Sequence, residues 1–545
     1  MKKYILLSVA LLTFTVSCNN SDDNNIIDKQ PQGLQFNFTE ADYGEEEVLS
    51  RAETVQTETV DFGDCEAEVS VENESVGKVL QTETRIISNK HYTIRAYQGG
   101  VKKGEIKGTF NGATFTPDAG SPNDIYVEPG SCDFVAFNDD VTPVGENLTV
   151  DESKMQTARI ATFTTTITAQ KQQQVNFEMK HVCARLRTQF VCQKHMPNNI
   201  TATLEETTPN AVPASVSYNP VTKAYTPVTT KSITPQANNS PASVQAKFTA
   251  SNGGQTFAYT STSNYHYFLP TAEGSKLKLT FNAGTIFWNP MSGIIPKLNA
   301  TLIMQPNKSY VVKIKLKPKF TYLFSDGTTG FRSQTTYGGA PAATAKIPVG
   351  VVIEPNKKVA VGLKHFYYKW QIIGDYKQYN TNLAYDIQTL LSWENGYDET
   401  WNAANNTSNV SWGQSIPKGN HSGFPAFYNA GHYNPGVTLS GGLAGKLWYL
   451  PACGEWKYIF TTIAFGDIAA LNALTYYGYV SCYSNLANDA FTQVGGVPMV
   501  GNNHWTSSQN HPAEAAQVAV NATNMNWNRH EWNKYGNHVR AFIRY

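Results

Sequence analysis

Charged residues are scarce in this chain, and neither sign is in excess. Only 16% of the 545 residues are Asp, Glu, Lys or Arg, and 43 basic residues balance 43 acidic ones. A neutral chain with so few charges has no overall electrostatic attraction to nucleic acid, so we expect no nucleic-acid partner. Beyond the first residues, no stretch approaches the length of about 18 apolar residues that a membrane-spanning helix needs.

The sequence also lacks the short patterns that mark common enzyme and metal sites. It contains no Gly-x-Ser-x-Gly motif, no His-Glu-x-x-His motif and no Cys-x-x-Cys pair. No spacing of histidines and carboxylates picks out an acid–base pair either. We therefore expect no catalytic residues, no metal and no cofactor. A carbohydrate-active or maturation enzyme is the alternative of a different class.

The amino terminus has the pattern of an export signal. The basic start Met1-Lys2-Lys3 precedes an apolar run from Ile5 to Val16, and a small residue then precedes Cys18. This order is typical of a secretory signal peptide over residues 1–18. The cysteine resembles that of a bacterial lipobox, which implies lipidation of Cys18 and an outer-membrane anchor; an ordinary signal peptide is the alternative. Ser21-Asp22-Asp23 resembles the acidic signal that directs lipoproteins to the cell surface.

Six cysteines remain after Cys18, and an even number permits disulfides in an exported protein. Cys453 and Cys482 are the candidate disulfide, because both lie in one predicted domain. Small buried thiols are the alternative interpretation.

Residues 34 to about 318 have the patterning of β-strands. Apolar and polar residues alternate over 34–39 and again over 312–317, which places one face of each strand on a core. Short Thr-, Val- and Tyr-rich runs with Gly, Pro and Asn turns lie between them, a pattern typical of β-sandwiches. A polar stretch after Cys192 divides this region into predicted domains 52–195 and 196–318, preceded by an amino-terminal strand segment, 19–51.

Composition changes after residue 318, where a third domain, 319–545, is predicted. Nine of the ten tryptophans lie between Trp370 and Trp532. Trp456, Ile459, Phe460 and Ile463 have helical spacing, and residues 383–393 have the pattern of a second helix. The chain is therefore predicted to be mainly β, with an α+β domain at its carboxyl end.

The first 318 residues resemble the fimbrillin-like lipoproteins that build type V pili. The resemblance rests on Tyr92–Tyr97, on Val127–Gly130 leading to Asp133–Asn138, and on Phe177–Leu186, in that order. It implies two tandem transthyretin-like β-sandwiches. It also implies assembly by strand exchange with other pilin subunits, after an arginine-specific protease removes an amino-terminal strand. Arg51-Ala52, which follows the acidic run 45–47, is the candidate scissile bond; an ordinary surface arginine is the alternative.

The last 227 residues, 319–545, resemble the C-type-lectin-like fold. The matching pieces are Leu447–Trp456, His504–Ser508 and Val539–Arg544. The resemblance implies that Trp448, Trp456 and Trp505 belong to the scaffold. The calcium-binding triplets of sugar-binding lectins are absent.

The final 45 residues are rich in asparagine and aromatic residues, a combination suited to a recognition surface. They resemble the variable terminus of lectin-fold proteins diversified by retroelements; an Asn-rich surface of an exported protein is the alternative. The predicted ligand-binding residues are Asn524, Asn526, Trp527, Asn528, His530, Trp532, Asn533, Tyr535 and Asn537.

These features predict a tip or accessory subunit of a type V pilus on the outer membrane. Its carboxyl-terminal domain is expected to bind a host or bacterial surface ligand in adhesion. A surface lipoprotein that binds glycan or protein without polymerising is the alternative.

Overall fold

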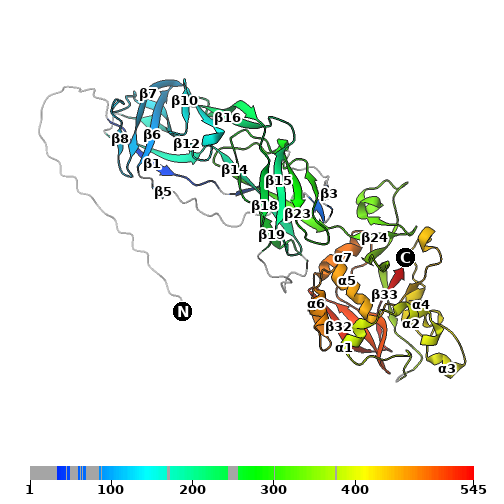
Figure 1. The fold of residues 1–545 in the computed structure, drawn as a ribbon. Helices are drawn as coiled ribbons and strands as arrows, with labels where there is room; N and C mark the ends of the chain where they lie inside the picture. Colours follow the sequence, from blue (N-terminus) through cyan, green and yellow to red (C-terminus); the bar gives the residue numbers. More distant parts are fainter. Residues whose placement is uncertain are drawn as a thin grey trace, which may run out of the picture. The chain divides into compact units, whose positions relative to one another are not determined.

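A computed structural model shows a chain built mainly from strands, as the sequence predicts (Figure 1). The structure describes residues 33–44, 46–49, 59–61, 63, 65–68, 85, 86, 89–168, 172–243, 254, 256–299, 301–374 and 377–545. No helix within these ranges is long and apolar enough to cross a membrane.

The chain forms two compact units, and each is assembled from separate stretches of sequence. The first contains the described residues within Met1–Thr39, Ile86–Ala136 and Ala161–Phe177, and the second contains those within Glu40–Arg85, Phe137–Ile160 and Glu178–Tyr545. The predicted boundary at residue 195 falls within the second unit. Strands on both sides of it share sheets, because β11 pairs with β16 and β14 pairs with β23.

The first unit supplies most of an eight-stranded sheet. In spatial order its strands are β5 (Arg85–Ile86), β1 (Gln35–Glu40), β13 (Gln174–His181), β12 (Arg159–Ile167), β9 (Gly130–Asn138), β6 (Lys90–Gln98), β7 (Val101–Phe110) and β8 (Phe115–Pro117). Alternate residues of β13, Val175 and Phe177 among them, are buried and the residues between them are exposed. The period of two thus places one face of the strand on the core.

Three sheets of the second unit lie before residue 319. A four-stranded sheet has the order β10 (Thr142–Val144), β11 (Asn147–Asp151), β16 (Val212–Asn219) and β17 (Ala224–Lys231). A seven-stranded sheet has the order β19 (Tyr259–Thr262), β14 (Ala184–Cys192), β23 (Ser309–Pro318), β4 (Cys65–Glu68) and β3 (Thr59–Asp61), with β2 (Glu46–Leu49) on β23 and β20 (His266–Phe268) on β14. Another four-stranded sheet has the order β18 (Gln236–Ser240), β15 (Ile200–Glu206), β21 (Leu277–Ala283) and β22 (Gly293–Ile295).

The last two of these sheets share one core. Phe190 on β14 and Phe281 on β21 have ring centroids 5.5 Å apart, and both belong to a single buried cluster with Ile314 and Leu316 of β23. Two sheets that bury their inner faces against each other form a β-sandwich. The transthyretin-like assignment stays a prediction.

Residues 321–544, which we call the C-terminal domain after its prediction from the sequence, contain a ten-stranded sheet. The main order is β25 (Thr329–Phe331), β24 (Thr321–Phe324), β26 (Pro348–Glu354), β27 (Val359–Lys369), β33 (Gly536–Arg544), β30 (Asn502–His511), β31 (Glu514–Val520), β32 (Asn524–Trp532) and β29 (Gly478–Ser481), with β28 (Trp448–Tyr449) on β33. Its α-helices are α1 (Ile387–Ser392), α2 (Gly396–Trp401), α3 (Ser408–Trp412), α4 (Pro425–Gly431), α5 (Trp456–Thr462), α6 (Ile468–Asn472) and α7 (Ser484–Thr492).

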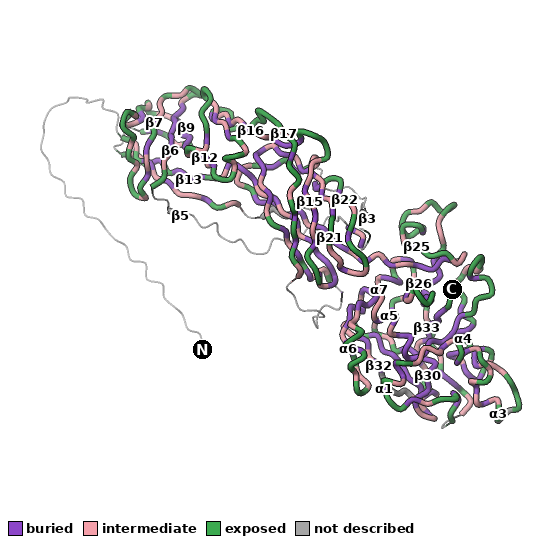
Figure 2. The backbone as a smooth tube through the Cα atoms, viewed as in Figure 1, coloured by how far each residue is buried: buried purple, intermediate pink, exposed green. Residues whose placement is uncertain are grey.

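Strand β33 has a core on each of its two faces. Phe542 belongs to one buried cluster with residues of α5 and α7, whereas Ala541 and Ile543 belong to another with residues of α4. Figure 1 shows α5 and α7 on one side of β33 and α4 on the other, and β33 itself is coloured as buried in Figure 2. Helices therefore cover both faces of the sheet at this strand.

The scaffold tryptophans are buried, as predicted. Trp448, Trp456 and Trp505 are at most 3% exposed. Trp370, for which the sequence indicates no role, is also buried, and its Nε1 donates to the backbone oxygen of Thr506 over 2.8 Å. The lectin-like assignment stays a prediction.

Candidate functional sites

A single amino-terminal segment, residues 35–49, supplies a strand to two different sheets. Strand β1 lies between β5 and β13 in the eight-stranded sheet. Strand β2 runs parallel to β23, with Glu46 opposite Ser309 and Leu49 opposite Val312. The lipidation site Cys18 and the candidate scissile bond Arg51-Ala52 lie outside the described residues. Of the segment that cleavage at Arg51 would detach, the structure describes residues 33–44 and 46–49.

Strand β1 is anchored by two phenylalanines. Phe38 stacks on Tyr92 with ring centroids 4.3 Å apart and lies 5.2 Å from Phe177. Phe36 makes an edge contact with Phe115 at 5.8 Å. Both side chains are buried, and full burial of a phenylalanine contributes about 1.5–3 kcal/mol. The strand is therefore a packed part of the core.

Strand β23 is covered along one edge by two short strands. Its first half, Ser309–Val312, pairs with β2, and its second half, Lys315–Pro318, pairs with β4. The opposite edge pairs with β14 over residues 309–316. The first half of β23 therefore has β14 on one edge and depends on β2, from the amino-terminal segment, for pairing on the other edge.

The connector between β1 and β2 is held by Asn307. The backbone N–H of Gly44 donates to the carbonyl of Asn307 over 2.9 Å, and the Asn307 side-chain amide donates to the carbonyl of Asp42 over 3.2 Å. Asn307 has φ of 60°, in the left-handed region that asparagine tolerates better than most residues. Its Oδ1 accepts the N–H of His181. Asn307 therefore ties the connector to His181 at the end of β13, just before β23 begins at Ser309.

Tyr43, in this connector, occupies a socket made by His181, Cys183, Arg185 and Tyr267. Its ring stacks on the His181 imidazole with a centroid distance of 4.0 Å and an interplanar angle of 9°. Its hydroxyl lies 2.9 Å from Cys183 Sγ, and the Arg185 guanidinium carbon lies 4.6 Å from its ring centroid. Tyr267 makes a tilted ring contact at 6.2 Å.

Burial sets the protonation of the groups in this socket. Burial, together with the positive charge of Arg159, lowers the pKa of His181 to about 4, so the imidazole is neutral at pH 7. Burial also raises the pKa of the Cys183 thiol and that of Tyr43, which stay protonated. The socket is thus an apolar and aromatic recess beside the Arg185 guanidinium.

The predicted ligand-binding residues do not form one exposed surface. Asn524, Asn526 and Trp532 are half-buried and Tyr535 is exposed, whereas Trp527, Asn533 and Asn537 are buried. The side chains of Asn528 and His530 lie outside the described residues. Trp527 is fully buried and makes an edge contact with Phe460 at 5.2 Å, so the structure places it in the core and not on a ligand surface.

The buried asparagines have intramolecular partners that hold the end of the sheet. Asn533 Oδ1 accepts the side-chain amide of Gln371 over 2.8 Å, and its backbone N–H donates to Ala513 over 3.0 Å. Asn537 donates to Gln517 Oε1 over 2.9 Å. Their interpretation as ligand contacts is therefore corrected: Asn533 holds the turn between β32 and β33, and Asn537 ties β33 to β31.

The turn held by Asn533 presents Trp532, Lys534 and Tyr535. The Lys534 ammonium lies 4.6 Å from the centroid of the Trp532 ring. Tyr367, which sequence reasoning missed, is 64% exposed and its ring occupies the space where a Cβ on Gly536 would lie. The aromatic run at residues 366–368 is the signal that could have identified it. We call Tyr367, Trp532, Lys534 and Tyr535 the terminal patch.

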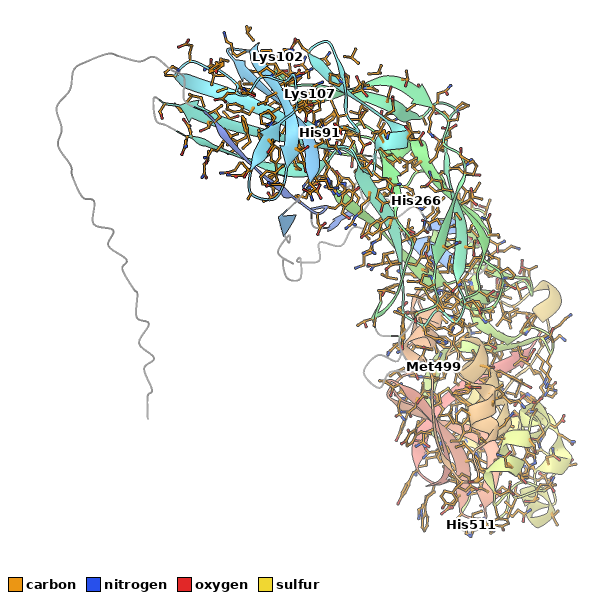
Figure 3. The ribbon with its side chains drawn as sticks, turned by 60° about the vertical axis from the view of Figure 1, so that its left-hand side comes forward. His91, Lys102, Lys107, His266, Met499 and His511 are labelled. Carbon is orange, nitrogen blue, oxygen red and sulfur yellow. The ribbon has the colours of Figure 1, made fainter. Side chains whose placement is uncertain are left out.

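The terminal patch lies at one end of the domain. Asn533 hydrogen-bonds to Ala513, which follows His511 at the turn between β30 and β31. Figure 3 shows His511 at one end of the C-terminal domain, well away from Met499. The two turns therefore meet at the end marked by His511.

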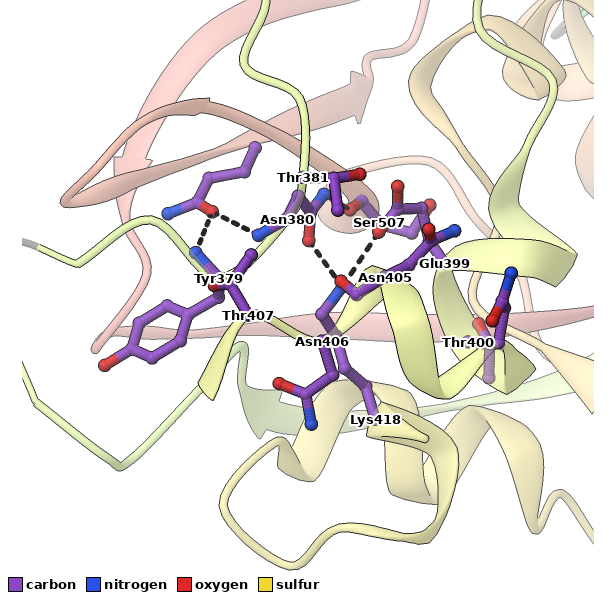
Figure 4. Close-up of polar contacts among 12 residues, drawn as sticks. Tyr379, Asn380, Thr381, Glu399, Thr400, Asn405, Asn406, Thr407, Lys418 and Ser507 are labelled. Atoms are coloured by element: carbon purple, nitrogen blue, oxygen red, sulfur yellow. Dashed lines mark hydrogen bonds and ion pairs between the residues drawn. The ribbon is translucent and has the colours of Figure 1, made fainter. Parts of the chain in front are cut away.

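A buried ion pair fixes the long segment that precedes α4. The Lys418 ammonium donates to Glu399 Oε2 over 2.8 Å, to Asn380 Oδ1 over 2.7 Å and to the Asn405 carbonyl over 2.7 Å (Figure 4). Burial lowers the pKa of Lys418 and raises that of Glu399, and their mutual attraction opposes both shifts. All three ammonium donors are used, as burial of a charge requires.

The same segment is tied to β30. Gln509 Oε1 accepts the backbone N–H groups of Tyr379 and Asn380, over 2.7 and 3.0 Å. The Asn380 amide donates in turn to the carbonyl of Ser507 over 2.8 Å. These contacts hold residues 379 and 380, which belong to no helix or strand, against the sheet.

The candidate disulfide is not formed. Cys453 and Cys482 are both buried free thiols. Cys482 Sγ lies 3.2 Å from Ser484 Oγ, and burial raises the pKa of each thiol to about 12. Both side chains serve as small buried groups, the alternative that the sequence left open. No cluster of three or more metal-ligating side chains occurs among the described residues.

No protein-family model matches the sequence, and no curated protein matches it. Solved structures similar to this one include a fimbrial protein from Bacteroides ovatus, with 11% identity over 95% of this chain and 100% of the other and a TM-score of 0.25. Another is a fimbrial protein from Bacteroides vulgatus, with 11% identity over 42% and 91% and a TM-score of 0.27. A fimbrial assembly protein from Parabacteroides distasonis has 8% identity over 45% and 91% and a TM-score of 0.23. TM-scores this low do not establish a shared function, so function is inferred from the residues of this chain.

Proposed function

We propose that this chain is a subunit of a type V pilus assembled by strand exchange, with its C-terminal domain as the adhesive part. The observation that carries the proposal is that residues 35–49 supply one strand to each of two sheets. A strand that detaches leaves backbone N–H and C=O groups unpaired along a sheet edge, and a strand from another subunit can pair with them.

Cleavage between Arg51 and Ala52 would detach β1 and β2 together. The first half of β23, Ser309–Val312, would lose its partner on one edge. The aromatic recess that holds Phe36 and Phe38 would open at the same time. Each loss alone raises the free energy of the cleaved chain, because apolar side chains and unpaired backbone groups become exposed to solvent. A single incoming strand that restores both contacts is therefore strongly favoured.

The position of β33 supports a terminal or accessory place in the fibre. It lies between β27 and β30, and its side chains Val539, Ala541 and Ile543 are buried. Withdrawing this strand for donation would divide the sheet and expose both of its cores. The chain is therefore suited to accept a strand and to present its C-terminal domain, with the terminal patch, to a host or bacterial ligand.

We further propose where the chain is anchored and which folds its parts adopt. Lipidation of Cys18 would anchor the chain to the outer membrane before cleavage. The sequence resemblances further imply transthyretin-like β-sandwiches, a lectin-like C-terminal domain and a terminus diversified by retroelements. We assign it no catalytic role and no cofactor. A non-polymerising surface lipoprotein that binds its ligand through the same patch is the second candidate, favoured if Cys18 is retained on the mature chain.

The test is to compare bacteria that express the chain with Arg51 and the Arg51→Lys variant. The lysine keeps the positive charge but is not a substrate for an arginine-specific protease. We expect mature protein that begins at Ala52 and lies on isolated fibres only with Arg51, read by mass spectrometry and immunogold labelling. Mature wild-type protein that still begins at Cys18 would refute processing and favour the second candidate.

A further inference from the structure

We propose that the Tyr43 socket is a specificity subsite, which selects a strand carrying an aromatic residue, tyrosine above all, at this position. The inference rests on the proposed function, because it concerns the strand that replaces residues 35–49. The proposed partner is a segment of a second protein that runs in the direction of β1 and carries the side-chain pattern of residues 35–49.

The socket discriminates through side-chain contacts. A tyrosine ring gains from stacking at 4.0 Å on His181 and from the guanidinium of Arg185 at 4.6 Å, and its hydroxyl reaches Cys183. Aromatic pairs and cation–π contacts are both stronger than contacts of an aliphatic side chain of similar area. A leucine would lose all three contacts, and a phenylalanine would lose only the contact with the thiol.

The backbone contacts of the connector carry no such information. Asn307 accepts the N–H of residue 44 and donates to the carbonyl of residue 42, groups that every residue other than proline possesses. The N–H of Ala41 likewise donates to the carbonyl of Met179 over 3.0 Å. These bonds set the register of the strand, and the side chain at position 43 then decides how well the strand fits.

The walls of the socket are held by contacts that do not involve Tyr43. Arg185 Nε donates to Ser309 Oγ over 2.9 Å, and its guanidinium also lies 4.1 Å from the ring centroid of Tyr265. The backbone N–H of His181 donates to Asn307 Oδ1 over 3.0 Å. The recess is therefore preorganised for a replacing side chain, which lowers the entropic cost of binding.

The spacing of the buried side chains defines the expected partner. Phe36 and Phe38 fill the aromatic recess of the first unit, and Tyr43 follows Phe38 by five positions. A replacing strand is thus expected to carry two large apolar residues two positions apart, followed five positions later by an aromatic residue. Partner subunits are to be sought by this pattern.

The experiment uses the chain cleaved at Arg51 by an arginine-specific protease, and fluorescein-labelled peptides with the sequence of residues 33–50. Binding is followed by fluorescence anisotropy. We expect the Tyr43→Leu peptide to bind about tenfold more weakly than the native peptide, and the Tyr43→Phe peptide about threefold more weakly. The matched control is Gln35→Ala, a change at an exposed position of β1, which is expected to leave the affinity unchanged.

A second arm changes the protein instead of the peptide. In the His181→Ala chain the native peptide should lose most of its advantage over the Tyr43→Leu peptide, with folding checked by thermal unfolding. Uptake of the native and Tyr43→Leu peptides with affinities within twofold would overturn the socket inference and leave strand exchange standing. Failure of the cleaved chain to take up any peptide would overturn the proposed function and this inference together.

Discussion

Lys418 reaches Glu399 at 2.8 Å in a place where neither side chain is appreciably exposed. Removing the lysine leaves a buried carboxylate without its cation, which typically destabilises a protein by about 3–5 kcal/mol. We therefore expect the Lys418→Met variant to lose stability on this scale, measured by denaturant unfolding of the full chain.

The double variant Lys418→Met/Glu399→Leu is the control for this ion pair. Replacing both charges by apolar side chains removes the unpaired carboxylate, so most of the lost stability should return. A double variant as unstable as the single one would show that the lysine acts through Asn380 and Asn405, not through the charge of Glu399.

Asn533 and Tyr535 are two positions apart, yet substitution should affect them differently. Asn533→Ala removes the acceptor of the Gln371 amide in a buried place, which typically costs about 1–3 kcal/mol. Tyr535→Ala changes a side chain that is 53% exposed, and we expect a change within about 0.5 kcal/mol. Urea unfolding of both variants checks the assignment, and equal losses would contradict it.

Glu394 should make stability depend on pH in the acid range. Burial acts to raise the pKa of its carboxyl, but hydrogen bonds from Lys357, Lys457 and Tyr458 outweigh burial and lower it to about 2. A carboxyl whose pKa is lower in the folded state stabilises the fold above its unfolded pKa of about 4.3 and loses that contribution as the pH falls towards 2. The stability difference between wild type and Glu394→Gln should therefore be constant near neutrality and shrink below about pH 4.3. A difference that is flat from pH 7 to pH 2 would rule out this role.

The free thiols of Cys453 and Cys482 predict the outcome of alkylation. Because both are buried and burial holds the pKa of each near 12, neither should react with iodoacetamide in the native protein. Unfolding without reductant should expose both to alkylation, as measured by mass spectrometry of the peptides. Protection that persists after unfolding and disappears only with reductant would demonstrate a disulfide.

Periodic patterns made much of the fold predictable. The alternation over residues 34–39 and 312–317 corresponds to β1 and β23, and the stripe that starts at Trp456 corresponds to α5. The predicted helix over residues 383–393 is shorter, because Asp386 accepts the N–H of Thr389 and so caps α1 at Ile387. Local spacing predicts such elements well, since each depends on neighbours in the sequence.

Contacts between distant residues were not predictable in the same way. Trp527 and Asn533 look like surface residues in an Asn-rich run, but their environment is set by Phe460 and Gln371, which lie far away in sequence. The pairing of β11 with β16 similarly crosses the boundary that composition suggested at residue 195. For the socket, the sequence showed the segment that contains Tyr43 but not the walls, because His181 and Tyr267 come from other strands.

The central place of β33 has a consequence for biosynthesis. Its residues, 536–544, are the last strand of the domain in chain order, yet they separate β27 from β30 and contribute to both cores. Until this strand is synthesised, the more than two hundred preceding residues of the domain cannot complete the sheet, and its future faces stay unshielded. A chain truncated before residue 536 would therefore be unable to close this sheet.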